Sequence, residues 1–344
     1  MIATPLSAEL AERVAEVDER VRLLYDPPVL PPSRWSGDVT GDPGFERDPA
    51  GERRWTELLA GADVLFGIPG NSGGGLVETL RAAPRVRWVQ ARNAGAGEQL
   101  GAALALEPAL LRDVVVTSVS GIHAGPLAEF ALLGVLAFAK RLPELERDKA
   151  RRAWPDVKPT MGVLAGRTVL VVGLGAIGLE FARLARALGM RVLGVKRTPQ
   201  DLPEVDEVAP PDRLTELARQ ADALVVTLPL TDGTRGLVDR ATLAALRPGA
   251  VVVNVGRGAV VDEPALIDAL RGRSISGACL DVFAEEPLPA DSPLWTLDNV
   301  ILSPHVAART DDEDERAVEL FTDNLRRHLD GAPLRNRVDP SRLY

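Results

Sequence analysis

The sequence predicts an α/β fold made of two doubly wound parallel-sheet domains. Three observations lead to this prediction. Short apolar runs alternate with helical segments, which is the pattern of a parallel sheet with helices on both faces. The alternation occurs twice, on either side of a break rich in Pro and Arg at residues 151–166. The 344 residues are also enough for two domains, at roughly 150 residues each.

The first half contains three short apolar runs that predict strands, at residues 62–68, 86–90 and 113–118. Helices are expected at residues 7–24, at about 52–59, after the second strand and at 126–140. Prolines at positions 27, 28, 31 and 32 separate the first two helices, because proline lacks the N–H that continues a helix.

The second half has a more regular pattern. Strands are predicted at residues 168–173, 191–195, 223–228, 250–255, 276–282 and 299–303. Helices are expected at residues 176–188, 211–219 and about 311–329. Such uniformly apolar strands are typical of a parallel sheet that is covered on both faces. The last helix opens with the acidic run DDEDE, which complements the positive end of the helix dipole.

The composition argues against several classes of function. The chain has 40 Lys and Arg against 49 Asp and Glu, a net charge of −9, which disfavours nucleic-acid binding. The most apolar stretch, residues 126–139, contains Glu129 and is shorter than the ~20 residues that span a membrane. The N-terminal segment lacks an export signal, so a cytoplasmic location is expected. A single cysteine, Cys279, and three histidines disfavour an internal disulfide and a metal site.

A glycine-rich turn follows the strand at residues 168–173. Gly173, Gly175 and Gly178 have the spacing G-x-G-x-x-G, with Ala176 and Ile177 between the last two glycines. The first glycine permits a tight turn, the second lets the backbone approach a pyrophosphate, and the third allows close packing of helix on strand. The helix N-terminus adds free N–H groups. The strand–turn–helix context therefore predicts a dinucleotide-binding Rossmann domain.

The next strand indicates which dinucleotide is bound. An NAD site usually carries an Asp or Glu about 20 residues further on, which binds the ribose 2′-hydroxyl. Here the corresponding residues are Lys196, Arg197 and Thr198. Two cations and a hydroxyl suit a 2′-phosphate; the alternative is that Lys196 and Arg197 are ordinary surface residues. The prediction is NADP(H), with NAD(H) possible.

Three further segments supply polar residues at predicted strand ends: Arg257 in VVVNVGRGAVVDE, Glu286 in GACLDVFAEEPLP and His305 in SPHVA. The carboxyl ends of parallel strands are where open α/β sheets bind ligands. Each residue alone has an ordinary interpretation, as a loop cation, a solvated turn residue or a hydrogen-bonded core histidine. A guanidinium, a carboxylate and an imidazole together, after a dinucleotide motif, point to catalysis.

Together these motifs resemble the D-2-hydroxyacid dehydrogenase family over about residues 60–330. The matching segments are GLGAIG, PLTDGTRGLV, NVGRGAVVDE, LDVFAEEPLP and SPHVA, in the family's order. The resemblance implies a Rossmann coenzyme domain, residues 123–309, inserted into a flavodoxin-like substrate domain, residues 1–122 plus 310–344. It also implies a homodimer formed through the coenzyme domain, which the segment at residues 142–161 could stabilise by wrapping around a partner subunit.

The resemblance also implies residue roles. Arg257 binds the substrate carboxylate, His305 is the general acid/base at the C2 oxygen, and Glu286 pairs with His305 and favours its protonated form. Asp281 holds the nicotinamide carboxamide. The remaining implied cofactor contacts are Thr227, Leu228, Pro229, Thr234 and Val255, together with Arg257 and His305.

Two glycine-rich segments in the first half, GIPGNSGGG at 67–75 and RNAGAG at 92–97, face the substrate in the family. Their backbone N–H groups could bind a carboxylate, and Gly95 and Ala96 are the predicted substrate contacts; plain flexible turns are the alternative. The second segment departs from the family's usual S-A-G-V-D, because it reads Asn93-Ala94-Gly95-Ala96-Gly97.

The predicted function is hydride transfer between NADPH and C2 of a small 2-ketoacid or D-2-hydroxyacid, similar to glyoxylate/hydroxypyruvate reductases. An NAD-linked D-3-phosphoglycerate dehydrogenase is the alternative enzyme. It is disfavoured because no carboxylate follows the second strand of the Rossmann domain and no C-terminal regulatory domain is seen. An NAD(H)-sensing corepressor-like interaction protein is the non-enzymatic alternative.

Overall fold

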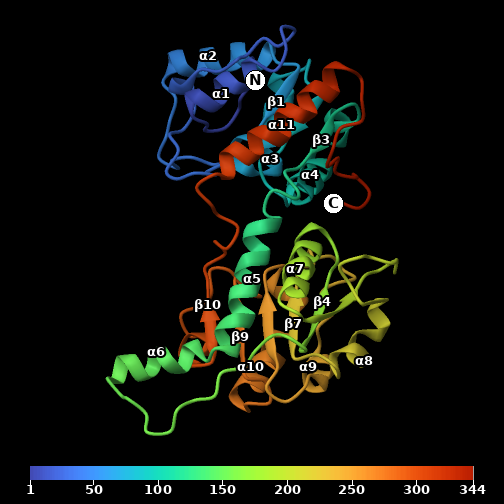
Figure 1. The fold of residues 1–344 in the computed structure, drawn as a ribbon. Coiled ribbons are helices and arrows are strands. Elements are labelled where there is room, and N and C mark those ends of the chain that lie inside the picture. The colour runs from blue at the N-terminus through green and yellow to red at the C-terminus, as the bar shows by residue number, and fades with distance from the viewer. Residues whose placement is uncertain (344) are drawn as a thin grey trace. The chain divides into compact units, whose positions relative to one another are not determined.

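The computed structural model describes residues 1–343 (Figure 1). The chain divides into two compact units. Unit 1 consists of residues 1–122 and the residues from Arg309 onward, and unit 2 consists of residues 123–308. Each unit contains its own parallel sheet. The α/β fold with parallel sheets that the sequence predicts is therefore confirmed.

The sheet of unit 1 has the order β1-β2-β3. Its strands are β1 (Val64–Phe66), β2 (Trp88–Gln90) and β3 (Val115–Thr117). Ile2 extends the sheet beside β1 through a parallel bridge to Phe66, and the N–H of Ile2 donates to Leu24 O at 3.0 Å. The segment at Ile2, which is first in the chain, therefore lies between the segment at Leu24, which is second, and β1, which is third. This is the flavodoxin-like arrangement.

The helices of unit 1 are α1 (Ala8–Ala15), α2 (Pro49–Ala60), α3 (Gly73–Ala82), α4 (Ala96–Leu106) and α11 (Glu313–Leu329). Helix α11 returns from the far end of the chain and packs on the sheet. Its Phe321 stacks on Phe66 of β1 with ring centroids 4.5 Å apart and lies 5.3 Å from the ring of Trp88. Aromatic contacts of this kind add to the burial of apolar area, so α11 belongs to the core of unit 1.

The acidic run that opens α11 does more than complement the helix dipole. Asp314 forms an ion pair with Arg92, whose side chain is only 2% exposed. Burial lowers the pKa of the Arg92 guanidinium, and the Asp314 carboxylate opposes this change. A buried charge without a partner is costly, so this pair ties the start of α11 to the end of β2.

Two local predictions for unit 1 are wrong. The helix expected at residues 7–24 ends at Ala15. Asp18 accepts a hydrogen bond from the N–H of Arg20 at 2.9 Å, a local contact that competes with the helix, and the following residues extend toward Leu24 beside Ile2. The glycines at 73–75 begin α3 instead of forming a loop, since Ser72 accepts from the N–H of Gly75 at 3.0 Å.

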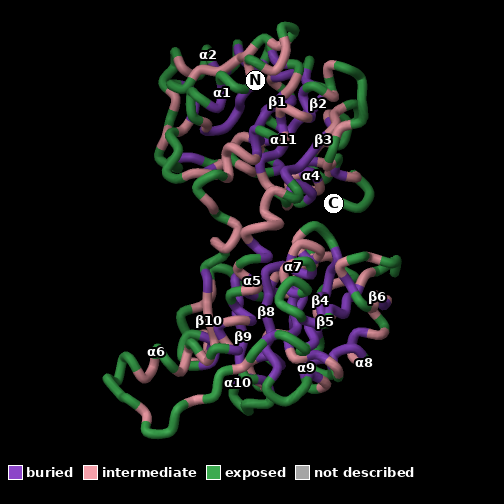
Figure 2. Tube along the Cα trace, viewed as in Figure 1, coloured by how far each residue is buried: buried purple, intermediate pink, exposed green. Residues whose placement is uncertain are grey.

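Unit 2 contains a seven-stranded parallel sheet with the order β10-β9-β8-β7-β4-β5-β6. Its strands are β4 (Thr168–Val172), β5 (Arg191–Val195), β6 (Glu207–Ala209), β7 (Ala223–Val226), β8 (Val251–Asn254), β9 (Gly277–Leu280) and β10 (Val300–Leu302). Every residue of β4, β7, β8 and β9 is buried (Figure 2). The strand order reverses between β4 and β7, so ligand binding is expected at the carboxyl ends of these strands.

The helices of unit 2 are α5 (Ala124–Ala139), α6 (Leu142–Arg151), α7 (Ala176–Ala187), α8 (Leu214–Ala218), α9 (Arg240–Ala245) and α10 (Glu263–Arg271). Helix α5 packs closely on β9, because a Cβ at Gly134 would lie 2.7 Å from Cβ of Cys279. Cys279 is completely buried, and burial raises the pKa of its thiol to about 12. The thiol is therefore a small apolar core group.

Helix α6 and the loop after it differ from the rest of unit 2. They extend away from the sheet (Figure 1), and α6 has no buried residue. Several apolar side chains of this segment are exposed, namely Leu142, Leu145, Trp154, Val157, Met161 and Val163.

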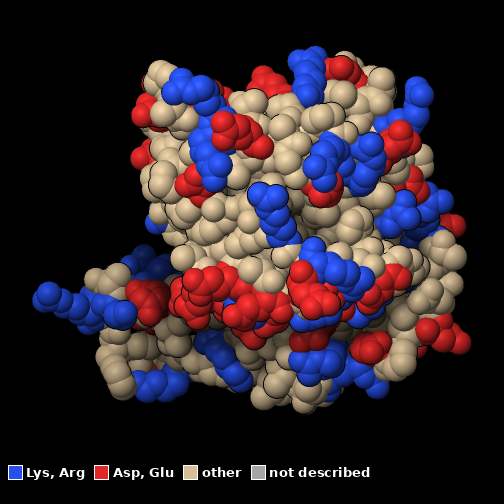
Figure 3. Space-filling model, turned by 90° about the horizontal axis from the view of Figure 1, so that it is seen from above, with Lys and Arg blue, Asp and Glu red and all other residues tan. Residues whose placement is uncertain are grey.

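Two properties of the molecule bear on the classes of function that the composition disfavours, namely the distribution of surface charge and the length of the apolar helices. On the face drawn in Figure 3, basic and acidic side chains are interspersed and do not form one broad basic surface. Within residues 1–343, none of the helices combines the length and the apolar character that crossing a membrane requires.

Candidate active site

The turn between β4 and α7 is shaped for a dinucleotide. Gly173 has φ +110°, and a Cβ at Gly178 would lie 1.9 Å from the Gly173 carbonyl oxygen. In contrast, a Cβ at Gly175 would have no heavy atom within 4 Å. Gly175 is also the N-cap of α7, and it has no side chain to cap the free N–H groups of the first turn. These N–H groups and the open space beside them fit a pyrophosphate.

The carboxyl end of the neighbouring strand carries the predicted 2′-phosphate residues. The N–H of Lys196 donates to Ala209 O at 3.0 Å, which holds the backbone just beyond β5 against β6. Lys196 is half-buried, and Arg197 and Thr198 are exposed. Since β5 pairs with β4, these residues follow the strand next to the glycine turn.

The loop after β7 lies against the same turn. The hydroxyl of Thr227 donates to Gly173 O at 2.7 Å, and that of Thr234 donates to Pro229 O at 2.7 Å. Thr227 therefore joins β7 to the glycine turn, and the Thr234 contact gives the 229–234 segment a defined shape. These residues, for which the family resemblance implies cofactor contacts, follow the carboxyl end of β7.

The side chain of Asn254, the last residue of β8, shapes the turn that carries Arg257. Asn254 is 1% exposed, accepts from the N–H of Gly256 at 3.0 Å and donates to Arg257 O at 3.1 Å. The next residue, Gly258, makes a very close approach, because a Cβ there would lie 1.8 Å from the carbonyl carbon of Phe283. Only glycine permits this contact. The close approach of Gly258 to the Phe283 backbone therefore sets the distance between the turn that carries Arg257 and the turn that carries Phe283.

Glu286 and His305 form a hydrogen-bonded pair. The Nδ1 atom of His305 lies 2.7 Å from Oε2 of Glu286. The other oxygen, Oε1, accepts from the N–H of Phe283 at 3.0 Å, which fixes the orientation of the carboxylate. The side chains of His305 and Glu286 are 46% and 35% exposed, and Nδ1 is engaged by Glu286. This arrangement leaves Nε2 to exchange a proton with a substrate.

Asp281 holds the segment that contains His305. Its side chain is almost fully buried, and Oδ1 accepts from Ser303 Oγ at 2.6 Å and from the N–H groups of Val306 at 2.9 Å and Ala307 at 3.1 Å. Its backbone oxygen accepts from the N–H of His305 at 2.9 Å. His305 has φ +55°, a sparsely populated conformation that needs such support. The family resemblance implies a contact of Asp281 with the carboxamide, and the sequence gives no sign of this second contribution.

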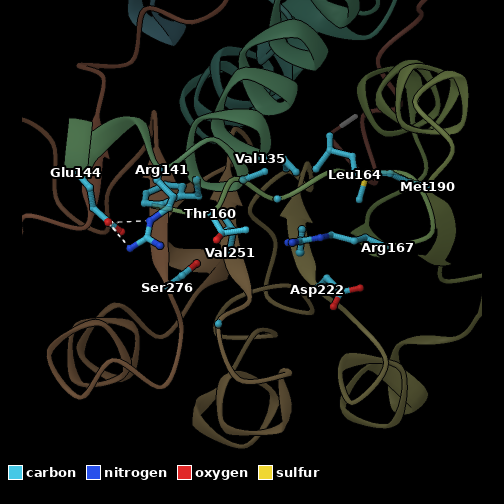
Figure 4. A pocket seen from close by; sticks show the side chains of 15 residues that line it. Val135, Arg141, Glu144, Thr160, Leu164, Arg167, Met190, Asp222, Val251 and Ser276 are labelled. Carbon is cyan, nitrogen blue, oxygen red and sulfur yellow. Dashed lines mark hydrogen bonds and ion pairs between the residues drawn. The ribbon is translucent and has the colours of Figure 1, made fainter. Parts of the chain in front are cut away.

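Two cavities of unit 2 lie in different places. An apolar cavity of about 640 Å³ adjoins Glu286 and His305 and is lined by Phe283, Leu288, Trp295 and Leu302. A smaller one, of about 250 Å³, includes residues at the amino ends of the strands, such as Ala223 and Val251. Figure 4 shows that Arg141 and Glu144 face one another at this second cavity. It opens at the edge of the sheet opposite the glycine turn, so it is separate from the candidate active site.

In unit 1, the two glycine-rich segments meet. The side-chain amide of Asn93 donates to Oδ1 of Asn71 at 2.8 Å. Gly95 is the N-cap of α4, and it provides no side-chain hydrogen bond to the first turn, whereas Ser72 caps α3. The backbone N–H groups at this helix start, at Gly95 and Ala96, therefore receive no side-chain cap and can bind a carboxylate.

The structure thus collects the predicted residues in two places. The carboxyl edge of the seven-stranded sheet holds the glycine turn, the Lys196 segment, Arg257, Asp281 and the Glu286–His305 pair. Gly95 and Ala96 belong to unit 1. Within residues 1–343, no group of three or more His, Cys, Asp or Glu side chains is arranged to hold a metal ion.

The family model for the NAD binding domain of D-isomer specific 2-hydroxyacid dehydrogenases matches residues 132–307. This range contains the glycine turn and all three predicted catalytic residues. The chain belongs to the D-isomer specific 2-hydroxyacid dehydrogenase family.

Curated relatives of this dehydrogenase include glyoxylate/hydroxypyruvate reductase B of Yersinia pestis, 34% identical over 83% of this chain and 88% of that protein. D-3-phosphoglycerate dehydrogenase of Methanocaldococcus jannaschii is 35% identical over 68% of this chain. The match spans only 45% of that relative's length. The family assignment therefore extends over most of this chain, and the relatives act on different substrates.

Two solved structures show the same fold. A D-isomer specific 2-hydroxyacid dehydrogenase from Xanthobacter autotrophicus, in complex with NADPH and MES, has a TM-score of 0.75 and 31% identity, covering 100% of this chain and 99% of that one. An NADPH-dependent glyoxylate/hydroxypyruvate reductase from Sinorhizobium meliloti, in complex with NADP and sulfate, has a TM-score of 0.76 and 26% identity, covering 100% and 98%. The protein is an NAD(P)-dependent dehydrogenase of this family.

Replacement of Gly258 by alanine tests the close approach in this dehydrogenase. The new methyl group must push the Arg257 turn away from Phe283, and a misplacement of about 1 Å costs on the order of a hundredfold in rate. We expect Gly258→Ala to lower kcat/KM for glyoxylate by about that factor, measured by NADPH oxidation. Gly125→Ala is the control, since a Cβ there meets no heavy atom within 4 Å. An unchanged rate for Gly258→Ala would contradict the positioning role.

Proposed function

We propose that this dehydrogenase reduces small 2-ketoacids, of the glyoxylate or hydroxypyruvate type, to D-2-hydroxyacids with NADPH. The observation that carries the proposal is the 2.7 Å hydrogen bond between Glu286 and His305, on the sheet edge that also contains the glycine turn. A paired imidazole beside a dinucleotide site has the chemistry needed to protonate a carbonyl oxygen while it is reduced.

In this mechanism, bound NADPH supplies the hydride that reaches C2 of the ketoacid. Arg257 binds the substrate carboxylate and polarises the C2 carbonyl, for which a guanidinium is suited by its planar set of donors. His305 donates the proton from Nε2 to the C2 oxygen. Glu286 accepts the hydrogen bond from Nδ1, which fixes the orientation of the ring and leaves Nε2 for the proton transfer. In the reverse reaction, neutral His305 accepts the proton.

We propose that the free N–H groups at Gly95 and Ala96 also bind the substrate carboxylate. Three features of unit 1 support this: the N-terminus of α4 has no side-chain cap, it follows the carboxyl end of β2, and it belongs to a segment that faces the substrate in the family. Backbone N–H groups at a helix start attract a carboxylate by both hydrogen bonding and the helix dipole.

The preference for NADPH rests on the residues after β5. No carboxylate occupies positions 196–198, where an NAD site would bind the ribose 2′-hydroxyl, and Lys196 and Arg197 can pair with a 2′-phosphate. The solved structures of the relatives from Xanthobacter autotrophicus and Sinorhizobium meliloti contain NADPH and NADP. Both points favour NADPH over NADH as the cofactor. They therefore also favour a reductase over an NAD-linked phosphoglycerate dehydrogenase.

We also propose that the chain forms a homodimer through α6 and the loop that follows. Trp154 and Val157 are each 86% exposed. Such exposure is unusual for large apolar residues, and it arises here because their segment has little contact with its own unit. Burial of such side chains by a second copy would be favourable, and symmetric dimers are the commonest oligomers.

His305→Ala tests the assignment of the proton donor. Loss of a general acid is expected to lower kcat for glyoxylate by about 10²–10⁴-fold, with NADPH affinity, measured by fluorescence titration, unchanged. Glu286→Gln is the companion variant, because it keeps a hydrogen bond to Nδ1 and removes the charge. We expect it to lose less activity than His305→Ala, because the imidazole is still present and is still hydrogen-bonded at Nδ1. Near-normal turnover by His305→Ala would exclude His305 as the donor.

Arg197→Ala tests the cofactor preference. A charged hydrogen bond contributes about 1.5–3 kcal/mol, so kcat/KM for NADPH should fall by roughly 10–100-fold, while kcat/KM for NADH should hardly change. Arg183→Ala is the control, since Arg183 lies on α7 and pairs with Glu180. An equal loss with both cofactors would show that Arg197 does not recognise the 2′-phosphate.

Light scattering tests the dimer. The unaltered chain should have about twice its monomer mass of 36.7 kDa, and the double variant Trp154→Glu, Val157→Glu should be monomeric because charges replace the apolar contacts. Lys149→Ala, on the same segment, is the control and should remain dimeric. A monomeric mass for the unaltered chain would contradict the proposal.

A further inference from the structure

The chain passes between the two units twice, and both connections join unit 1 beside one arginine of α11. The first connection leaves unit 1 after Ile122, and the second returns to it at Arg309. The side chain of Arg316 donates from Nη1 to Ile122 O at 2.6 Å and from Nη2 to the hydroxyl of Thr310. One guanidinium group therefore binds both connections at the points where they join unit 1.

Arg316 is itself fixed within unit 1. It lies near the start of α11, and the helix buries Ala317, Val318 and Phe321 in the core. The side chain of Arg316 is 23% exposed and forms an ion pair with Asp312 at 3.0 Å. Because the helix is packed and the charge is paired, the guanidinium can serve as an anchor for the two connections.

The second connection is held on both of its sides. In unit 2, the N–H of Ala307 donates to Asp281 Oδ1 at 3.1 Å. In unit 1, the guanidinium of Arg309 lies 4.8 Å from the centre of the Trp35 ring, which is a cation–π contact. Only the backbone bonds of Ala308 lie between these two holds.

The first connection is equally short. Arg316 binds the carbonyl oxygen of Ile122, and the next residue, His123, is already the N-cap of α5. The carbonyl oxygen of His123 accepts from the N–H of Leu127 at 3.1 Å. Hinges in proteins are a few residues at the ends of such elements, which absorb changes in backbone angles. In this chain the corresponding positions are His123 and Ala308.

From these contacts we infer that Arg316 is a positioning residue for the dehydrogenase reaction. It makes both connections leave unit 1 from one place, so that any turning of unit 2 takes place at His123 and Ala308. It also fixes Thr310, in the segment that follows the proton donor His305. This inference rests on the proposed function, which uses His305 of unit 2 together with N–H groups of unit 1.

Three variants remove the anchor in different ways. Arg316→Ala removes both bonds. Arg316→Lys keeps a positive charge beside Asp312 but lacks the planar set of donors that reaches two acceptors at once. Thr310→Val removes the bond to the second connection alone and keeps the shape of the side chain. Arg326→Ala is the matched control, because Arg326 is an exposed arginine of the same helix.

The first measurement is the rate of NADPH oxidation with glyoxylate. We expect kcat/KM to fall by about ten- to hundredfold in Arg316→Ala and Arg316→Lys, because small misplacements of reacting groups have effects of that size. Thr310→Val should lose less, and adding it to Arg316→Ala should cause no further loss, since both changes act on one contact. Arg326→Ala should keep the unaltered rate.

Two further measurements separate positioning from stability. The dissociation constant of NADPH should be the same in all variants, because the glycine turn belongs to unit 2 and does not contact Arg316. Arg316→Lys should also keep the melting temperature of the unaltered protein, because it retains the charge beside Asp312. A merely structural arginine would give the opposite result for this variant, a normal rate whenever the melting temperature is normal.

Amide hydrogen exchange tests the hold directly and without turnover, since lost contacts permit local opening. Deuterium uptake should rise at residues 119–124 and 306–312 in Arg316→Ala, and only at residues 306–312 in Thr310→Val. The seven-stranded sheet is the internal reference, and its uptake should be unchanged.

Each contrary result has a distinct meaning. Unaltered uptake at both segments in Arg316→Ala would show that Arg316 does not hold the connections, and the inference would be wrong. Raised uptake with an unaltered glyoxylate rate would show that Arg316 only fastens α11, and the proposed function would stand. If the unaltered chain reduces neither glyoxylate nor hydroxypyruvate, the proposed function fails, and the positioning role fails with it. If Arg316→Ala does not fold, Arg316→Lys and Thr310→Val decide by the same measurements.

Discussion

Asp281 provides the interaction on which the rest of the catalytic edge depends. One buried carboxylate oxygen receives three hydrogen bonds from the segment 303–307, and the backbone of the same residue receives a fourth from His305. Together they hold His305 in a positive-φ conformation that the chain would not adopt unaided. Because His305 is held there, Glu286 can reach its Nδ1 atom, and the imidazole is left with one free nitrogen.

Two further constraints bring other groups to this edge. The side chain of Asn254 closes the turn before Arg257, and the missing side chain of Gly258 lets that turn touch the backbone of Phe283. The parallel strands of unit 2 bring the remaining groups to this edge, because all their carboxyl ends meet there, and the strand order also reverses in this sheet. In unit 1, the uncapped start of α4 supplies N–H groups of the kind that bind a carboxylate. Conformational support at this edge therefore comes from backbone groups as much as from side chains.

The sequence predicts well what depends on local pattern. Apart from their first residues, Thr168 and Arg191, the strands at 168–172 and 191–195 are apolar because the sheet is covered on both faces. The glycine spacing is readable because Gly173 has a positive φ, a Cβ at Gly178 would collide with the Gly173 carbonyl oxygen, and the open space at Gly175 suits a pyrophosphate. What it could not predict depends on contacts between distant residues. The hydrogen bonds that Asp281 accepts from residues 303–307 and the approach of the Leu343 backbone to Gly97 join segments whose proximity exists only in the folded chain. The glycine at position 97 was visible as a departure from the family pattern, but its cause was not.

The most direct test of the central claim is a comparison of cofactors with the unaltered protein. NADPH and NADH would each be supplied with glyoxylate and hydroxypyruvate, and oxidation of the reduced nicotinamide would be followed by absorbance. The proposed mechanism predicts turnover of both acids, with kcat/KM for NADPH at least about tenfold above that for NADH, the factor expected from one charged hydrogen bond to the 2′-phosphate. Tight NADPH binding without turnover of either acid, or equal use of the two cofactors, would contradict it.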